Sequence, residues 1–292
     1  MENLETLLYK KEVSVSLSTP RPLECFSVDK NRKLMDNDLN CLRYFIYPEL
    51  PLDLNDGFKS FIKKPDTAKH EGLKHLLEFV LKKQLCINYF SSKTLDVDFI
   101  CFRGLLSLLM RTPYEKQSWT VCAVRWKGAI YLCEFDKCEY SFEKAELFNY
   151  YGHKFEQYTL SNSPHNNINK NEPVNECEEF CVVFESFLND FKLLYGAEVD
   201  GIISDITHSS KSFLTNANFV ELKTNRLIDN QQQQFSFQKH KLLKFWTQSF
   251  LVGIKTIMVG YRSDSGILKK ILPLQVSDIP KTCERFCKKK YV

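Results

Sequence analysis

Residues 197–224 read AEVDGIISDITHSSKSFLTNANFVELKT, and this stretch decides how the middle of the chain is expected to fold. In a β-strand, side chains two positions apart lie on the same face of the sheet. In a strand over 197–203, Glu198 and Asp200 would therefore project together while Val199 points into the core. The pattern predicts a short strand that directs two carboxylates toward one site.

The end of the same stretch predicts a second strand over 219–224. Its Glu221 and Lys223 share one face, and the apolar residues beside them share the other. Clustered carboxylates repel one another, and their pKa values rise unless a divalent cation neutralises them. Oxygen ligands suit Mg²⁺ or Mn²⁺ better than zinc, and such a metal activates water for attack on a phosphate ester. The two strands therefore indicate a metal-dependent hydrolase, although charges at this spacing also occur on ordinary exposed strands.

Hydrophobic spacing outside this stretch predicts alternating helices and strands. Residues 176–195 place Phe180, Phe184 and Phe191 at helical spacing, and Gly196 is the expected end of that helix. Further helices are expected over 72–84 and 237–250, a hairpin over 119–135, a loop over 161–174 and a strand over 255–261. This order of elements indicates an α/β (α+β) fold with a mixed β-sheet core flanked by helices.

Length and composition limit the class of protein. A chain of 292 residues with 43% hydrophobic content can bury one substantial core. We expect a lead-in segment over 1–21 and a single catalytic domain over 22–292. The net charge of +4 requires any polyanion site to come from local clustering. We expect no signal peptide and no membrane span, and the eleven scattered cysteines indicate reduced thiols.

Several motifs occur together along the chain. They are CFRGL at 101–105, TPYE at 112–115, GHKFEQY at 152–158, EVD at 198–200, ELK at 221–223 and FWTQSFLVG at 245–253. In these motifs the chain resembles the DXO family of decapping and exoribonuclease proteins, from Pro22 to Ser265. An Asp followed 21 positions later by Glu-x-Lys also resembles the PD-(D/E)xK nucleases. The resemblance implies a PD-(D/E)xK-like active site in a cleft. His153 departs from the family pattern, in which an apolar or aromatic residue is usual beside the glutamate.

The resemblance also implies a role for each residue of the site. The implied metal ligands are Glu156, Asp200, Glu221 and the backbone carbonyl of Leu222, with Glu198 bound through water. Lys223 would position the nucleophilic water, and Arg103 and Gln248 would contact RNA phosphates. The expected cofactor is Mg²⁺ or Mn²⁺, with two cations in the site. From the residues alone, a structural ion pair is the simpler interpretation of Arg103, and a helix-surface position that of Gln248.

The implied activity is the removal of incomplete or non-standard 5′ ends from RNA. Candidate ends are triphosphate, unmethylated cap and NAD cap, and 5′-to-3′ degradation is a candidate further activity. The expected partner is the 5′ end of single-stranded RNA, and we expect a monomer in the nucleus or cytoplasm. Two alternatives stay open: a protein that mainly stabilises a nuclear 5′-to-3′ exoribonuclease, and a catalytically silent protein that binds RNA ends. The intact acidic motifs argue against the second.

A basic, aromatic segment before the last motif is a candidate groove for a single strand of RNA. Its residues are Lys239, Lys241, Lys244, Phe235, Phe245 and Trp246. The alternative interpretation is a solvated basic face over aromatic residues of the core. We expect the aromatic side chains to belong to the core and at least one lysine to contact phosphate.

Overall fold

The computed structural model describes residues 15–36, 39–83, 96–115, 118–135, 144–166, 168–284 and 286. Within these residues two mixed β-sheets form the core. Sheet A has the strand order β2 (Leu34–Asp36), β1 (Arg21–Val28), β9 (Glu179–Leu188), β10 (Phe191–Glu198), β5 (Phe99–Phe102), β7 (Ala129–Phe135) and β6 (Thr120–Trp126). Sheet B has the order β4 (Leu52–Asp53), β14 (Ile267–Gln275), β13 (Thr256–Arg262), β12 (Phe219–Arg226), β11 (Gly201–Ile202), β3 (Tyr44–Phe45) and β8 (Leu160–Ser161).

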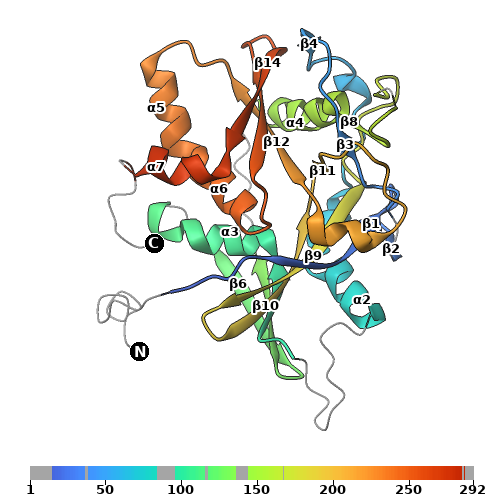
Figure 1. Cartoon of the computed structure of the whole chain (residues 1–292), viewed down its shortest axis with the longest axis vertical. Helices are drawn as coiled ribbons and strands as arrows, with labels where there is room; N and C mark the ends of the chain where they lie inside the picture. The colour runs from blue at the N-terminus through green and yellow to red at the C-terminus, as the bar shows by residue number, and fades with distance from the viewer. Residues whose placement is uncertain are drawn as a thin grey trace.

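Helices cover both sheets (Figure 1). They are α2 (Lys74–Lys83), α3 (Arg103–Arg111), α4 (Ala145–Thr159), α5 (Gln231–His240), α6 (Leu242–Phe250) and α7 (Ile279–Cys283), with short 3-10 turns between them. The α3 helix packs on α6, and α4 packs on β12. Figure 1 shows α5, α6 and α7 grouped on one side of β12 and β14, with α4 on the other side. None of the described helices combines the length and the apolar run that crossing a bilayer requires.

The predicted α/β class with a mixed sheet core is confirmed, as are several elements. The hairpin over 119–135 forms as β6 and β7, and the strands over 219–224 and 255–261 form as β12 and β13. The helix over 72–84 forms as α2, as far as Lys83. The helix over 237–250 is two helices, because α5 ends at His240 and α6 begins at Leu242.

The predicted helix over 176–195 is wrong, because these residues form the hairpin of β9 and β10. Strand β9 lies inside sheet A and is buried on both faces. Phe184 packs into one apolar cluster, while the preceding residue, Val183, packs into another. A strand buried on both faces is apolar at nearly every position, so helical spacing is satisfied by accident. Asn189, at a φ of 51°, makes the turn that the periodicity concealed.

Gly196 does not end a helix but lies within β10. A Cβ at this position would lie 2.9 Å from the ring of Phe102, so glycine allows close packing there.

The predicted continuous strand over 197–203 is also wrong, because the chain changes sheets within it. Glu198 is the last residue of β10 in sheet A, and Gly201 is the first residue of β11 in sheet B. Val199 and Asp200 form the connection and belong to neither strand. The acidic motif therefore lies where the two sheets meet, which brings groups from both sheets to one place.

Gly201 is a point of close approach beside this connection. A Cβ at Gly201 would lie 2.9 Å from the backbone oxygen of Arg43 and 2.9 Å from a methyl group of Leu160. Since the backbone oxygen cannot move without displacing β3 from β11, we expect Gly201→Ala to lower the free energy of unfolding by about 1–3 kcal/mol. Equilibrium denaturation in urea measures this change.

Gly152→Ala is the matched control, because Gly152 lies within α4 and a Cβ there meets no described atom within 4 Å. We expect this variant to gain about 0.5–1 kcal/mol, since alanine favours a helix interior. Equal midpoints for Gly201→Ala and wild type would show that β3 does not approach β11 as closely as described.

Candidate active site

A polar pocket of about 560 Å³ opens at the junction of the two sheets. Glu156 enters it from α4, Glu198 from the end of β10 and Asp200 from the connection to β11. Arg43 and several asparagine residues also line the pocket. Three of the four carboxylates predicted for the site therefore share one pocket, although they come from separate elements.

The fourth carboxylate, Glu221, is held by two cationic side chains. It is 1% exposed, and its Oε2 accepts a hydrogen bond from Nη1 of Arg103 at 3.1 Å, while its Oε1 contacts Nζ of Lys223. Burial acts to raise the pKa of Glu221, but the charges of Lys223 and Arg103 lower it to about 2. Glu221 and Lys223 share one face of β12, as the alternation predicted.

The negative charges of Asp200 and Glu198 are poorly compensated by neighbouring cationic groups. Burial raises the pKa of Asp200 well above its usual value, and the Glu221 carboxylate raises it further against the opposing charge of Lys223. Desolvation within the pocket and the Glu179 carboxylate raise the pKa of Glu198 to about 7. A bound cation would lower both pKa values, so the electrostatics favour a positively charged ligand.

The backbone holds Asp200 in place, because its Oδ2 accepts the N–H of Leu222 at 2.6 Å. This hydrogen bond links the connection after β10 directly to β12. It also places the backbone of Leu222 beside Asp200, one of the residues that line the pocket. A role for the carbonyl of Leu222 as a metal ligand stays a prediction.

The predicted ligands fit a hard divalent cation by chemistry, since all are carboxylate or carbonyl oxygens. However, their side chains are not arranged as a complete coordination sphere. In the part of the chain that the structure describes, no three His, Cys, Asp or Glu side chains are grouped closely enough to hold a metal ion. The oxygens of Glu221 face Arg103 and Lys223 instead, and one oxygen of Glu156 faces His153. Glu221 would have to rotate away from the two cationic side chains, Arg103 and Lys223, to join a bound cation.

Arg103 and Gln248 lie together beside the cluster. Nη1 of Arg103 donates to the backbone oxygen of Gln248 at 3.3 Å as well as to Glu221. The structural ion pair considered for Arg103 therefore exists. Gln248 is not a solvated surface residue, because its buried Oε1 has no hydrogen-bond partner among the described residues. Contact of either side chain with RNA phosphate stays a prediction.

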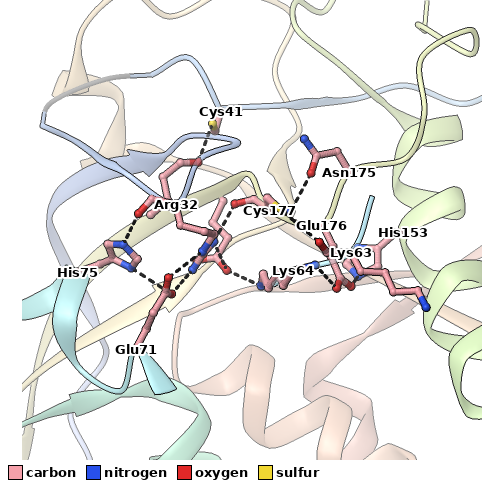
Figure 2. A network of polar contacts seen from close by, with 12 residues as sticks. Arg32, Cys41, Lys63, Lys64, Glu71, His75, His153, Asn175, Glu176 and Cys177 are labelled. Atoms are coloured by element: carbon pink, nitrogen blue, oxygen red, sulfur yellow. Dashed lines mark hydrogen bonds and ion pairs between the residues drawn. The ribbon is translucent and has the colours of Figure 1, made fainter. Parts of the chain in front are cut away.

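Two residues beside the site, His153 and Glu176, were given no role from the sequence. His153 contacts Glu156 through one ring nitrogen and Glu176 through the other. Its spacing of three from Glu156 on one helix was the available signal. No sequence signal pointed to Glu176, because it comes from the segment before β9. Figure 2 shows His153 and Glu176 at one end of a larger polar network that reaches Arg32.

The basic, aromatic segment is divided between core and surface. Phe245 is buried, as expected, while Phe235 is 47% exposed. Trp246 stacks on Phe250 with ring centroids 4.8 Å apart. Nζ of Lys241 donates to Oδ1 of Asn225 at 2.7 Å, which directs this lysine toward β12. A groove for RNA along this segment stays a prediction.

Comparison with known proteins gives consistent matches over nearly the whole chain. Residues 18–291 match a family model described as RAI1 like PD-(D/E)XK nuclease. A Drosophila melanogaster protein named "Decapping and exoribonuclease protein Rai1" is 33% identical over 280 residues, which cover 90% of this chain and 74% of that protein. The match therefore spans both sheets and every motif of the site.

Solved structures give the same result. S. pombe Rai1 in complex with 3′-FADP has a TM-score of 0.71 and 25% sequence identity, and the match covers 95% of this chain and 80% of that one. Candida albicans Rai1, solved in complex with pU5-Mn²⁺, has a TM-score of 0.75 and 24% identity, with coverage of 92% and 74%. The second comparison establishes a likeness of fold.

Proposed function

The chain belongs to the RAI1-like PD-(D/E)XK nuclease family, and from that premise we propose that it is a divalent-metal-dependent hydrolase of RNA 5′ ends. One observation carries the proposal. Two poorly compensated carboxylates with raised pKa values, Glu198 and Asp200, line a pocket next to the Glu221–Lys223 pair. Such a site attracts a cation and places an ammonium group beside it. Both are what phosphoryl hydrolysis requires.

Glu156, Glu198 and Asp200 would hold the cation, and Glu221 would join them by a side-chain rotation. A bound divalent cation supplies a polarised phosphoryl oxygen and a water of lowered pKa. Lys223, whose pKa is raised because the charges of Glu221 and Asp200 outweigh burial, stays protonated. Its Nζ would donate a hydrogen bond to the attacking water or to the phosphate. Arg103 would offset charge that develops on the phosphate oxygens.

The specific substrates we propose are RNAs with a triphosphate, an unmethylated cap or an NAD cap, with 5′-to-3′ degradation as a further activity. The size and polarity of the pocket support a nucleotide at the 5′ end, since it is about 560 Å³ in volume. The S. pombe relative was solved with 3′-FADP, a ligand of dinucleotide type. That supports a pocket able to accept a dinucleotide-type end.

A panel of RNAs tests the substrate class. Purified protein is incubated with Mg²⁺ or Mn²⁺ and RNA that carries each of these three ends or a 5′-monophosphate, and the released group is identified. We expect metal-dependent release from at least one non-standard end and none in the presence of a chelator. Binding of all four RNAs without any turnover would contradict the catalytic proposal. It would favour a role as an RNA-end binder or as a stabiliser of an exoribonuclease.

A further inference from the structure

His153 lies between two carboxylates at the wall of the pocket. Its Nδ1 is 3.2 Å from Oε2 of Glu156, and its Nε2 is 3.4 Å from Oε2 of Glu176. Because each ring nitrogen faces a carboxylate, the ring is held from both ends. Phe61 also packs against the ring, with centroids 5.9 Å apart. His153 therefore has one orientation that satisfies all of its neighbours.

Glu176 is a fixed support rather than a mobile surface side chain. Its Oε1 accepts the backbone N–H of Lys64 at 2.6 Å, and its Oε2 accepts Nδ2 of Asn149 at 3.1 Å. Burial acts to raise the pKa of Glu176, but the hydrogen bonds from His153 and Lys64 lower it to about 2. Glu176 is thus ionised, and Lys64 and Asn149 anchor it in addition to His153.

The support continues into the protein through partly buried ion pairs (Figure 2). Nζ of Lys64 lies 2.5 Å from Oε1 of Glu179, which also lies 3.0 Å from Nη1 of Arg32. Nη2 of Arg32 pairs with Glu71 at 2.7 Å. Since these partly buried side chains are joined to one another and to Glu176 through Lys64, the segment that carries Glu176 is restrained. The network gives His153 a rigid base.

From this arrangement we propose that His153 is a positioning residue that holds Glu156 in the orientation needed for cation binding. One carboxylate oxygen of Glu156 is engaged by His153, and the other is left for the pocket. The proposal rests on the proposed function, because it requires a cation bound by Glu156. Hydrogen bonds that orient a metal-binding side chain commonly change metal affinity about 10- to 100-fold. The effect here should act on affinity more than on the chemical step.

Calorimetric titration of the full chain with Mn²⁺ alone tests the proposal without RNA. We expect His153→Phe to weaken the apparent Kd for Mn²⁺ by about 10- to 100-fold. Saturating Mn²⁺ should restore kcat to within a few-fold of wild type. Glu176→Gln, which keeps the shape of the support but removes its charge, should weaken the Kd by a smaller factor. His240→Phe, at an exposed histidine in the last turn of α5, is the matched control and should bind as wild type does.

The outcomes separate the positioning role from the proposed function. Equal Kd values for wild type, His153→Phe and Glu176→Gln would overturn the role of His153 while leaving the hydrolase intact. If the wild-type protein neither binds Mn²⁺ nor turns over RNA, the proposed function fails and this proposal fails with it. If His153→Phe does not fold, Glu176→Gln decides alone. A wild-type Kd for that variant would then overturn the positioning role.

Discussion

Asp200→Asn is expected to reduce kcat on a 5′-modified RNA about 1000-fold while leaving the fold intact. The side chain keeps its shape, and its oxygen still accepts the N–H of Leu222, so the connection between the sheets is preserved. What is lost is one negative charge at the cation site. Loss of several kcal/mol of charge stabilisation corresponds to about three orders of magnitude in rate.

The same variant is expected to be as stable as wild type, or more stable, when no metal is present. Burial and the Glu221 carboxylate make the ionised form of Asp200 unfavourable, so a neutral amide relieves repulsion. A gain in stability with a loss of activity is the expected signature of a strained functional residue. Thermal unfolding with and without Mn²⁺ measures it.

Asp205→Asn, at an exposed position five residues away, is the matched control and should leave both activity and stability unchanged. If Asp200→Asn had the wild-type kcat at limiting Mn²⁺, Asp200 would not be part of the cation site.

Lys223→Met is expected to lower the single-turnover rate about 100- to 1000-fold with saturating metal. Lys223 is the cationic side chain on β12 closest in sequence to Glu221, and it contacts Oε1 of that carboxylate. Methionine keeps the length of the side chain but cannot donate a hydrogen bond to water or phosphate. Because Arg103 still pairs with Glu221, the carboxylate keeps one partner and the fold is expected to survive.

Lys255→Met is the control for this variant, since Lys255 is exposed just before β13. It removes the same charge from the protein without touching the site. RNA binding measured in a chelator separates the two roles of Lys223. We expect Lys223→Met to bind RNA within a few-fold of wild type. A loss of binding that matches the loss of rate would show that Lys223 anchors the substrate and takes no part in the hydrolysis.

The elements that sequence periodicity predicted well are those with distinct faces or a clear turn. Strand β12 alternates charged and apolar residues around Glu221, and the hairpin of β6 and β7 turns at Lys127 and Gly128. Strand β9 defeated the same reasoning because both of its faces are buried. Burial on two faces is a property of the assembled sheet, so local spacing could not reveal it. In the sequence, only Asn189 and its neighbour marked the turn between β9 and β10.

The site was anticipated in type but not in arrangement. Alternation correctly predicted that Glu221 and Lys223 share a face. Glu198 and Asp200 were assigned to one strand, whereas Glu198 ends β10 and Asp200 lies in the connection to β11. The pairing of His153 with Glu176 joins a helix to a distant segment, and such contacts depend on tertiary packing. Side-chain chemistry could be predicted locally, while the partners that orient it could not.

A doubly labelled RNA tests the central claim most directly. A short RNA with a 5′-triphosphate carries one label on its 5′ group and another at its 3′ end, and wild type and Asp200→Asn are each followed in Mn²⁺ and in a chelator. We predict that wild type with Mn²⁺ releases the 5′ label first, while the 3′ label is still attached to full-length RNA. The wild-type reaction in the chelator and the reaction of Asp200→Asn should release neither label at a comparable rate. Release that persists in the chelator, or internal cleavage ahead of 5′ release, would contradict a metal-dependent hydrolase of RNA 5′ ends.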